Sequence, residues 1–147
     1  MIDETFTTWR SRLLRFAAQL LQNRHDAEEI VQDVFARLLA EPDRFDLATG
    51  PEVLLFRLVR NRCIDRHRRR APRSNVDPEP AAAEPSDHSD LLHALGALPD
   101  DERETLLLTA VEGLGYREVA NVLGCSLGTV AARRCAAIQK LKKRLTP

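Results

Sequence analysis

The chain has 147 residues, which is enough for one average domain or two small ones and excludes a large barrel enzyme. Hydrophobic residues make up 44% and charged residues 30% of the sequence, a composition typical of a folded protein. No run reaches the roughly 18 apolar residues of a membrane span, and the first residues lack the basic start of a secretion signal. These features predict a cytoplasmic protein that makes no membrane contact of its own.

The formal net charge is zero, but the charges are segregated along the chain. Residues 26–52 contain eight acids and two arginines. Residues 57–73 contain eight arginines and one acid, and residues 133–144 contain six cations and no acid. Clustered cations favour a polyanionic partner, because each phosphate contact releases condensed counterions. A solvated helix face is the alternative explanation for either cluster alone.

A change of composition divides the chain into two domains. Residues 71–88 carry four prolines among alanines and acids, without apolar periodicity, which is typical of a flexible linker. The predicted domains are residues 1–70 and residues 89–147. Each is close to the lower size limit for independent folding.

The first domain is predicted to contain three helices. Apolar residues recur at intervals of three and four in the first of them, which is the period of an amphipathic helix. Asp26 and Glu29 have the spacing of a capping box at the start of the second helix, and Pro42 ends that helix soon after Glu41. Pro51 stands at the start of the third helix, which continues into the arginine cluster.

Each of these helices has an expected buried stripe. In the first helix it is Phe6, Trp9, Leu13, Phe16, Ala17, Leu20 and Leu21. In the second it is Ala27, Ile30, Val31, Val34, Phe35, Leu38 and Leu39. In the third it is Val53, Leu54, Phe56, Leu58, Val59 and Ile64. The cysteines form no C-x-x-C pair, so the simplest expectation is that they pack in the core.

The second domain is predicted to contain four helices. Ser89 caps a short helix through Leu95, and a second helix runs from about Asp100 to Glu112, where Gly113 ends it. Two further helices cover residues 116–123 and 127–145, separated by a turn at residues 124–126. Strand patterns are absent throughout, so the predicted fold class is all-α.

Residues 116–130 have the spacing of a helix-turn-helix. Ala120 is small where the two helices cross, Gly124 permits the positive φ of a sharp turn, and Ser126 can cap the second helix. The expected small core of the motif is Val119, Leu123 and Val130. The second helix is cationic, which suits a DNA major groove, with its first exposed residues and Arg133 and Arg134 toward bases and phosphates.

The three motifs in this order resemble one family, the bacterial RNA polymerase sigma factors of the extracytoplasmic-function (ECF) type. Residues 26–35 (DAEEIVQDVF) resemble the family's region 2.2, residues 58–70 (LVRNRCIDRHRRR) resemble region 2.4, and residues 95–145 resemble region 4. The resemblance covers almost the whole chain. It implies a protein that binds core RNA polymerase and directs promoter-specific transcription, with no cofactor and no enzymatic activity of its own.

The resemblance also implies roles for particular residues. The polymerase-binding face would be Asp26, Glu28, Glu29, Gln32, Asp33 and Phe35. The loop from Arg44 to Glu52 and the helix after it would read and open the minus-ten element, binding the melted non-template strand through Arg60, Asn61, Arg62, Asp65, Arg66, Arg68, Arg69 and Arg70. The last helix would bind double-stranded minus-35 DNA through Ser126, Leu127, Gly128, Thr129, Ala131, Ala132, Arg133 and Arg134. An anti-sigma factor is a further implied partner.

The sequence departs from the family pattern at three places. Leu54-Leu55 stands where the family usually has Trp-Leu, and Gly115 replaces the usual serine before the helix-turn-helix. Arg134 occupies a position where an apolar residue usually packs. Either the last helix rotates to bury Cys135 and Ile138, or the Arg134 side chain extends outward over its own stem.

Other classes of protein explain less of the sequence. A stand-alone helix-turn-helix regulator, binding a palindrome as a dimer, leaves the acidic helix and the first basic cluster without a role. A thiol or metal sensor would need its cysteines to converge across the linker, and no metal site is predicted. An enzyme is not indicated, because phosphate-binding loops, H-E-x-x-H and nucleophile elbows are missing.

Overall fold

The computed structural model describes residues 2–41, 43–44, 51–70 and 89–146. The chain divides into two compact units, residues 1–81 and residues 82–147. Unit 1 holds α1 (Ile2–Leu21), α2 (Arg24–Ala40) and α3 (Pro51–Arg70). Unit 2 holds α4 (Ser89–Gly96), α5 (Asp100–Leu106), the π-helical segment η2 (Leu107–Val111), α6 (Tyr116–Leu123) and α7 (Leu127–Leu145). The described residues form no strand, which confirms the all-α prediction.

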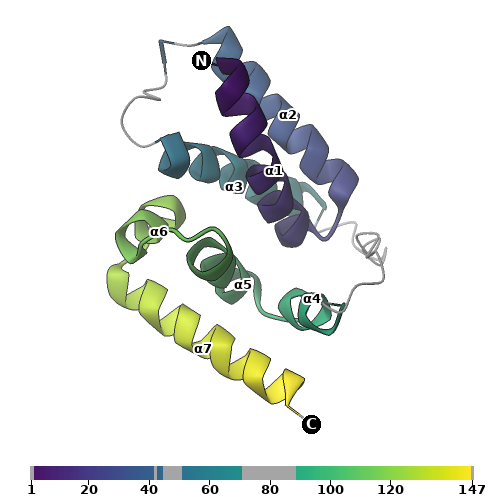
Figure 1. Ribbon diagram of the computed structural model, residues 1–147, viewed down its shortest axis with the longest axis vertical. Coiled ribbons are helices and arrows are strands. Elements are labelled where there is room, and N and C mark those ends of the chain that lie inside the picture. The colour runs from purple at the N-terminus through teal and green to yellow at the C-terminus, as the bar shows by residue number, and fades with distance from the viewer. Residues whose placement is uncertain (1, 42, 45–50, 71–88, 147) are drawn as a thin grey trace. The chain divides into compact units, whose positions relative to one another are not determined.

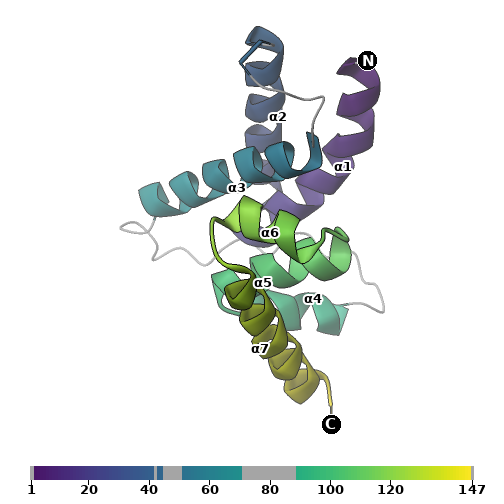
Figure 2. The same ribbon diagram turned by 90° about the vertical axis from the view of Figure 1, so that its left-hand side faces the viewer.

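In unit 1, α1 and α2 lie side by side and α3 crosses both (Figures 1 and 2). The three helices share one apolar core, whose fully buried large side chains are Leu13, Phe16, Ile30, Leu55, Phe56 and Val59. The rings of Phe16 and Phe56 meet edge to face, with centroids 5.3 Å apart, a favoured geometry that joins α1 to α3.

The start of α2 differs from the prediction. Asn23, rather than Asp26, is the N-cap residue, and its side-chain oxygen accepts a hydrogen bond from the N–H of Asp26 at 3.1 Å. Asn and Asp are equally good caps, and the helix begins three residues earlier than the capping-box pattern indicated. The carboxylate of Asp26 therefore does not cap the helix, and it is buried in the protein.

The predicted stripes are correct for most positions and wrong for a few. Leu39, in the last turn of α2, is 53% exposed. In α3 the buried set includes Leu55 and Cys63, whereas Val53, Leu54, Leu58 and Ile64 are only half-buried. Trp9 is also half-buried rather than a core residue.

In unit 2 the long helix α7 packs against α4, α5 and α6 (Figure 1). A buried cluster consists of Leu95 of α4, Leu98 of the connection between α4 and α5, Leu106 of α5 and Ala137 of α7, and Ile138 and Leu141 pack against it. Only one stripe of α7 is buried in this way, so the opposite side of the helix is open to solvent.

The predicted helix over residues 100–112 is interrupted by the π-helical turn at Leu107–Val111. The Thr109 hydroxyl donates to the carbonyl oxygens of Thr105 and Leu106, at 2.9 and 3.3 Å. A threonine that bonds back to the preceding turn competes with backbone N–H groups for those oxygens and bends helices. The 3.6-residue period of the sequence carries no sign of this bond. Gly113, with φ of +73°, follows at the predicted end of the helix.

The helix-turn-helix has the predicted geometry. Gly124 has φ of +68° and ends α6, and its N–H donates to the carbonyl of Ala120. Ser126 caps α7 by accepting a hydrogen bond from the N–H of Thr129 at 3.1 Å. The three expected core residues of the motif are all buried, namely Val119, Leu123 and Val130.

At the start of α6, Gly115 has no side chain that could cap the helix, and a residue of the helix itself contacts the N-cap backbone. The Glu118 carboxylate accepts a hydrogen bond from the N–H of Gly115 at 3.1 Å, which is one half of a capping box.

Ser89 is the first residue of α4. Several sequence predictions lie outside what the structure describes: the linker at 71–88, Pro42, most of the loop from Arg44 to Glu52, and the side chains of Phe6, Arg70 and Ser89.

Candidate functional site

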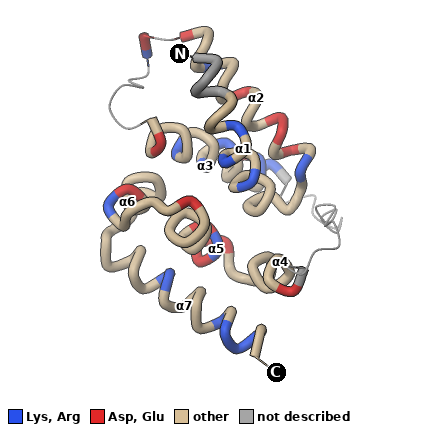
Figure 3. The backbone as a smooth tube through the Cα atoms, in the orientation of Figure 1, with Lys and Arg blue, Asp and Glu red and all other residues tan. Residues whose placement is uncertain are grey.

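The first candidate surface is the acidic face of α2, where acidic residues follow the helix in Figure 3. Four of the six residues predicted for it are exposed, namely Glu28, Glu29, Gln32 and Asp33. Asp26 and Phe35 are buried and cannot form an outer docking surface. Beside this face a hollow of about 200 Å³ lies between α1 and α2, lined by Arg10, Leu14, Glu28, Val31 and Gln32.

Arg66 joins the acidic helix to the basic one. One terminal nitrogen of its guanidinium lies 2.8 Å from a carboxylate oxygen of Glu29 and 3.1 Å from one of Asp26. The hydrogen bond to Glu29 raises the pKa of Arg66, against the opposing effect of partial burial, and the charge of Asp26 adds to the increase. The guanidinium therefore stays charged at any working pH. Arg66 holds α3 against α2 in this structure, although the sequence placed it among DNA contacts.

The second candidate surface is the basic face of α3. Asn61, Asp65, Arg68 and Arg69 are exposed, whereas Arg60 and Arg62 are half-buried. The exposed side chain of His67 makes a 3.0 Å hydrogen-bond contact with the carbonyl of Leu20, so it anchors this end of α3 to α1. Arg68 and Arg69 are thus the exposed cations in the last described turn of the helix.

A cluster of side chains around Arg12 of α1, at the start of α3, was not predicted from the sequence. The Arg12 guanidinium lies 2.7 Å from the Glu52 carboxylate and stacks over two rings, 4.7 Å from the centroid of Trp9 and 5.5 Å from that of Phe56. Cation–π contacts of this kind are expected for residues three apart on a helix, such as Trp9 and Arg12. The cluster fixes the first turn of α3 beside α1, next to the loop predicted to read DNA.

The third candidate surface is the outer side of α7, at the helix-turn-helix. Of the residues predicted for it, Ser126, Leu127, Gly128, Ala131 and Ala132 are exposed. Thr129 is half-buried and its hydroxyl lies 2.9 Å from that of Ser126. The exposed side chains at the start of α7 are uncharged, and most of them are small. The cations of α7 begin at Arg133 and continue along the helix.

The two alternatives for Arg134 can now be distinguished. Cys135 is exposed, so α7 does not rotate to bury it, and the expectation of a core cysteine is wrong at this position. Cys63 is buried as expected, and Cys125 is half-buried. Ala137 and Ile138 fill the packing positions that follow Val130, while Arg134 is half-buried beside them. The structure matches the alternative in which the Arg134 stem packs and its charge reaches solvent.

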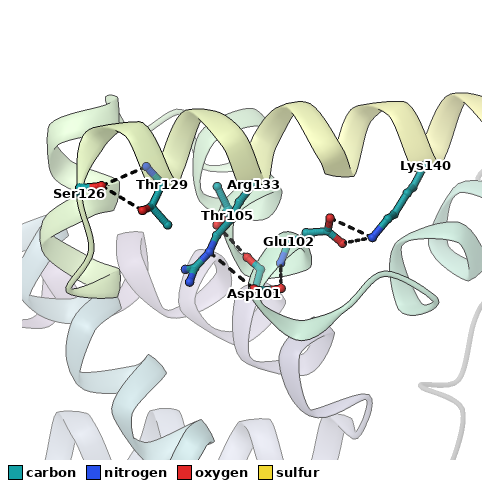
Figure 4. A network of polar contacts seen from close by, with 7 residues as sticks. All are labelled: Asp101, Glu102, Thr105, Ser126, Thr129, Arg133 and Lys140. Carbon is teal, nitrogen blue, oxygen red and sulfur yellow. Dashed lines mark hydrogen bonds and ion pairs between the residues drawn. The ribbon is translucent and has the colours of Figure 1, made fainter.

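Two ion pairs join α7 to the first turn of α5 (Figure 4). Arg133 Nε lies 3.6 Å from a carboxylate oxygen of Asp101. Lys140 Nζ lies 2.9 and 2.7 Å from the two carboxylate oxygens of Glu102. The sequence showed α7 as a continuous cationic helix, because the opposing acids are more than thirty residues away in the chain.

The described ranges contain neither a membrane-spanning helix nor a metal-binding cluster. No helix there is both long and apolar enough to cross a membrane. Across the same residues, no group of three or more His, Cys, Asp or Glu side chains is placed to hold a metal ion.

Comparison with known proteins defines the class to which the chain belongs. Residues 5–73 match the family Sigma-70 region 2, and residues 88–141 match the family Sigma-70, region 4. The order of these two matches along the chain is that of the two structural units.

The relatives narrow this class. The chain is 31% identical to ECF RNA polymerase sigma factor SigE of Mycolicibacterium smegmatis, across 97% of this chain and 61% of SigE. It is also 31% identical to ECF RNA polymerase sigma factor EcfG of Rhodopseudomonas palustris, across 90% of this chain and 78% of EcfG. Among solved structures it is similar to the sigma factor RpoE, in complex with the anti-sigma factor NepR from Bartonella quintana, with a TM-score of 0.82, 28% identity, and coverage of 97% of this chain and 95% of that chain. The chain therefore belongs to the ECF family of RNA polymerase sigma factors.

Proposed function

We propose that this sigma factor binds core RNA polymerase through the acidic face of α2 and directs it to promoters by two DNA contacts. The observation that carries the proposal is the exposure of three acids along α2, Glu28, Glu29 and Asp33, and of two arginines at the end of α3, Arg68 and Arg69. Acidic residues are repelled by DNA and are suited to a basic protein surface. The docking face consists of Glu28, Glu29, Gln32 and Asp33.

The minus-ten contact is assigned to α3. Asn61 and Asp65 are exposed and carry groups that can contact base edges, and Arg68 and Arg69 can contact phosphates. Extruding a base from the stack costs a few kcal/mol, which contacts of this kind must offset. Arg66 is excluded from the assignment, because its charge is held by Glu29 and Asp26.

The minus-35 contact is assigned to the start of α7. The exposed residues from Ser126 to Ala132 would enter the major groove, as the second helix of a helix-turn-helix does. We place region 2 at residues 1–70 and region 4 at residues 89–147, with the linker between them. An anti-sigma factor is a proposed further partner, because the similar sigma factor RpoE is bound to one.

The experiment that tests the α3 assignment measures promoter binding by the complex of the chain with core polymerase, as a function of salt concentration. A promoter is first selected from a random DNA library with the assembled complex. The variant Arg68→Gln/Arg69→Gln removes two exposed cations of α3 and should weaken promoter binding, with the salt dependence of log K reduced by about two.

The control for this experiment is Lys142→Gln/Lys143→Gln, which removes the same charge from the far end of α7. It should lower the salt dependence less than the α3 variant does. If the two variants lose promoter affinity and salt dependence to the same extent, Arg68 and Arg69 do not contact the promoter specifically. If the chain instead binds palindromic DNA tightly without polymerase, it is a stand-alone regulator.

A further inference from the structure

Arg133 belongs to the DNA-facing half of α7 but turns toward α5. Its Nε lies 3.6 Å from Asp101 Oδ2, with 30% of the arginine side chain and 52% of the aspartate side chain exposed (Figure 4). The other oxygen, Asp101 Oδ1, accepts a hydrogen bond from the N–H of Glu102 at 2.8 Å. The carboxylate is therefore fixed in position by the backbone, while the arginine is held only by a long contact that solvent can reach.

The neighbouring ion pair has a different character. Lys140 contacts both oxygens of Glu102 at normal hydrogen-bond distances, and only 10% of the Glu102 side chain is exposed. Lys140 also lies further along α7, thirteen residues after Leu127, or about 20 Å at 1.5 Å per residue. Arg133 is six residues after Leu127, or about 9 Å, within the part of the helix that a major groove accommodates.

We propose that Asp101 holds Arg133 while unit 2 is free of DNA, and that a DNA backbone phosphate replaces the carboxylate when α7 binds. Asp101 then lowers the DNA affinity of the helix-turn-helix, because its carboxylate competes with the phosphate for Arg133. Glu102 and Lys140 keep α7 attached to α5 in both states. This inference depends on the proposed function, in which α7 enters the major groove.

Two physical features make the exchange easy. An exposed ion pair at 3.6 Å contributes little free energy, so a phosphate can take the arginine at small cost. The phosphate contact also releases condensed counterions from the DNA to solvent, which favours the exchange. Arg133 follows the exposed residues Ala131 and Ala132 in α7, and 30% of its own side chain is exposed, so solvent and a phosphate have access to it.

The test compares two substitutions in the same turn of α5. Asp101→Asn removes the partner of Arg133, whereas Asp100→Asn makes the same charge change beside Arg103, which is on α5 itself. The full chain is titrated into a fluorescein-labelled 30-base-pair duplex of random sequence, and binding is followed by anisotropy between 50 and 200 mM KCl. We expect Asp101→Asn to bind about two- to fivefold more tightly than Asp100→Asn, which is the range for losing one exposed ion pair.

A second pair of variants assigns the effect to Arg133. With Arg133→Gln in the background, the difference between the two aspartate variants should disappear, and the salt dependence of log K should fall by about one. Equal affinities of Asp101→Asn and Asp100→Asn in the native background would overturn the proposal. A difference that persists in the Arg133→Gln background would also overturn it, because Asp101 would then act on DNA directly.

Ala131→Asp separates this inference from the proposed function. Ala131 is exposed on α7, so an acid there should weaken DNA binding about tenfold if the helix enters the groove. If Ala131→Asp has no effect, the DNA contact of α7 itself is wrong. If Ala131→Asp weakens binding while the aspartate variants stay equal, only the role of Asp101 is wrong. Thermal unfolding of each variant confirms that the fold is retained.

Discussion

Arg66 is the residue whose role changes most between the sequence and the structure. The sequence shows it as one arginine among eight, and nothing in a local pattern separates it from Arg68 or Arg69. Its partners are 37 and 40 residues earlier in the chain, so only the packing of α2 against α3 reveals them. The buried carboxylate of Asp26 was equally hidden, because it was assigned to the helix cap that Asn23 supplies.

Removing this contact should destabilise unit 1. Asp26→Asn keeps the shape of the side chain but leaves Arg66 without its buried counter-charge, so we expect the free energy of unfolding to fall by about 2 to 3 kcal/mol. The control is Glu28→Gln on the same helix, which breaks only the exposed pair with Arg24 and should change it by less than about 0.5 kcal/mol. Urea denaturation measures both values, and similar losses for the two variants would refute the structural role of Asp26.

At the scale of elements, the periodicity of the sequence identified the helices and the turn of the helix-turn-helix. These features depend on local chemistry: apolar spacing, a proline at a helix start, and glycine or serine at a turn. The π-helical turn was not predicted, since it involves a side-chain hydrogen bond from Thr109 that no spacing encodes. Leu39 has the spacing of the buried stripe of α2 but is 53% exposed, which the spacing alone does not indicate.

Two glycines of the helix-turn-helix should respond to alanine in opposite ways. Gly124 has φ of +68°, so Gly124→Ala should lower the free energy of unfolding by about 1 to 2 kcal/mol through backbone strain alone, since an added Cβ meets nothing within 4 Å. Gly128 lies in α7, and its added Cβ would be 3.9 Å from Ser126 Oγ, an ordinary contact. Gly128→Ala should therefore stabilise the protein by up to about 1 kcal/mol. Thermal and urea unfolding compare the two, and a loss of stability in both variants would contradict this account of the turn.

At the scale of the whole molecule, the segregation of charge along the chain was the most informative property of the sequence. In unit 1 most of the charged residues of α2 are acids and most of those of α3 are arginines (Figure 3). In unit 2 the segregation is partly cancelled, because the first turn of α5 holds Arg133 and Lys140. The number of cations in α7 therefore overstates the charge available to DNA.

The exposure of each residue on α2 decides which substitution can test the proposed docking face. Phe35 is 5% exposed, so truncating it would damage the core and could not report on a surface. Asp33 is exposed on the proposed face, and Asp90 is an equally exposed aspartate on α4. Asp33→Arg and Asp90→Arg therefore make the same charge change inside and outside the proposed docking face.

The binding of the fluorescently labelled chain to bacterial core RNA polymerase, measured by anisotropy, tests the central claim most directly. We expect submicromolar binding by the native chain, a loss of at least about tenfold in Asp33→Arg because a docking charge is reversed, and little change in Asp90→Arg. Absence of binding by the native chain, or equal binding by the two variants, would contradict polymerase docking through the acidic face of α2.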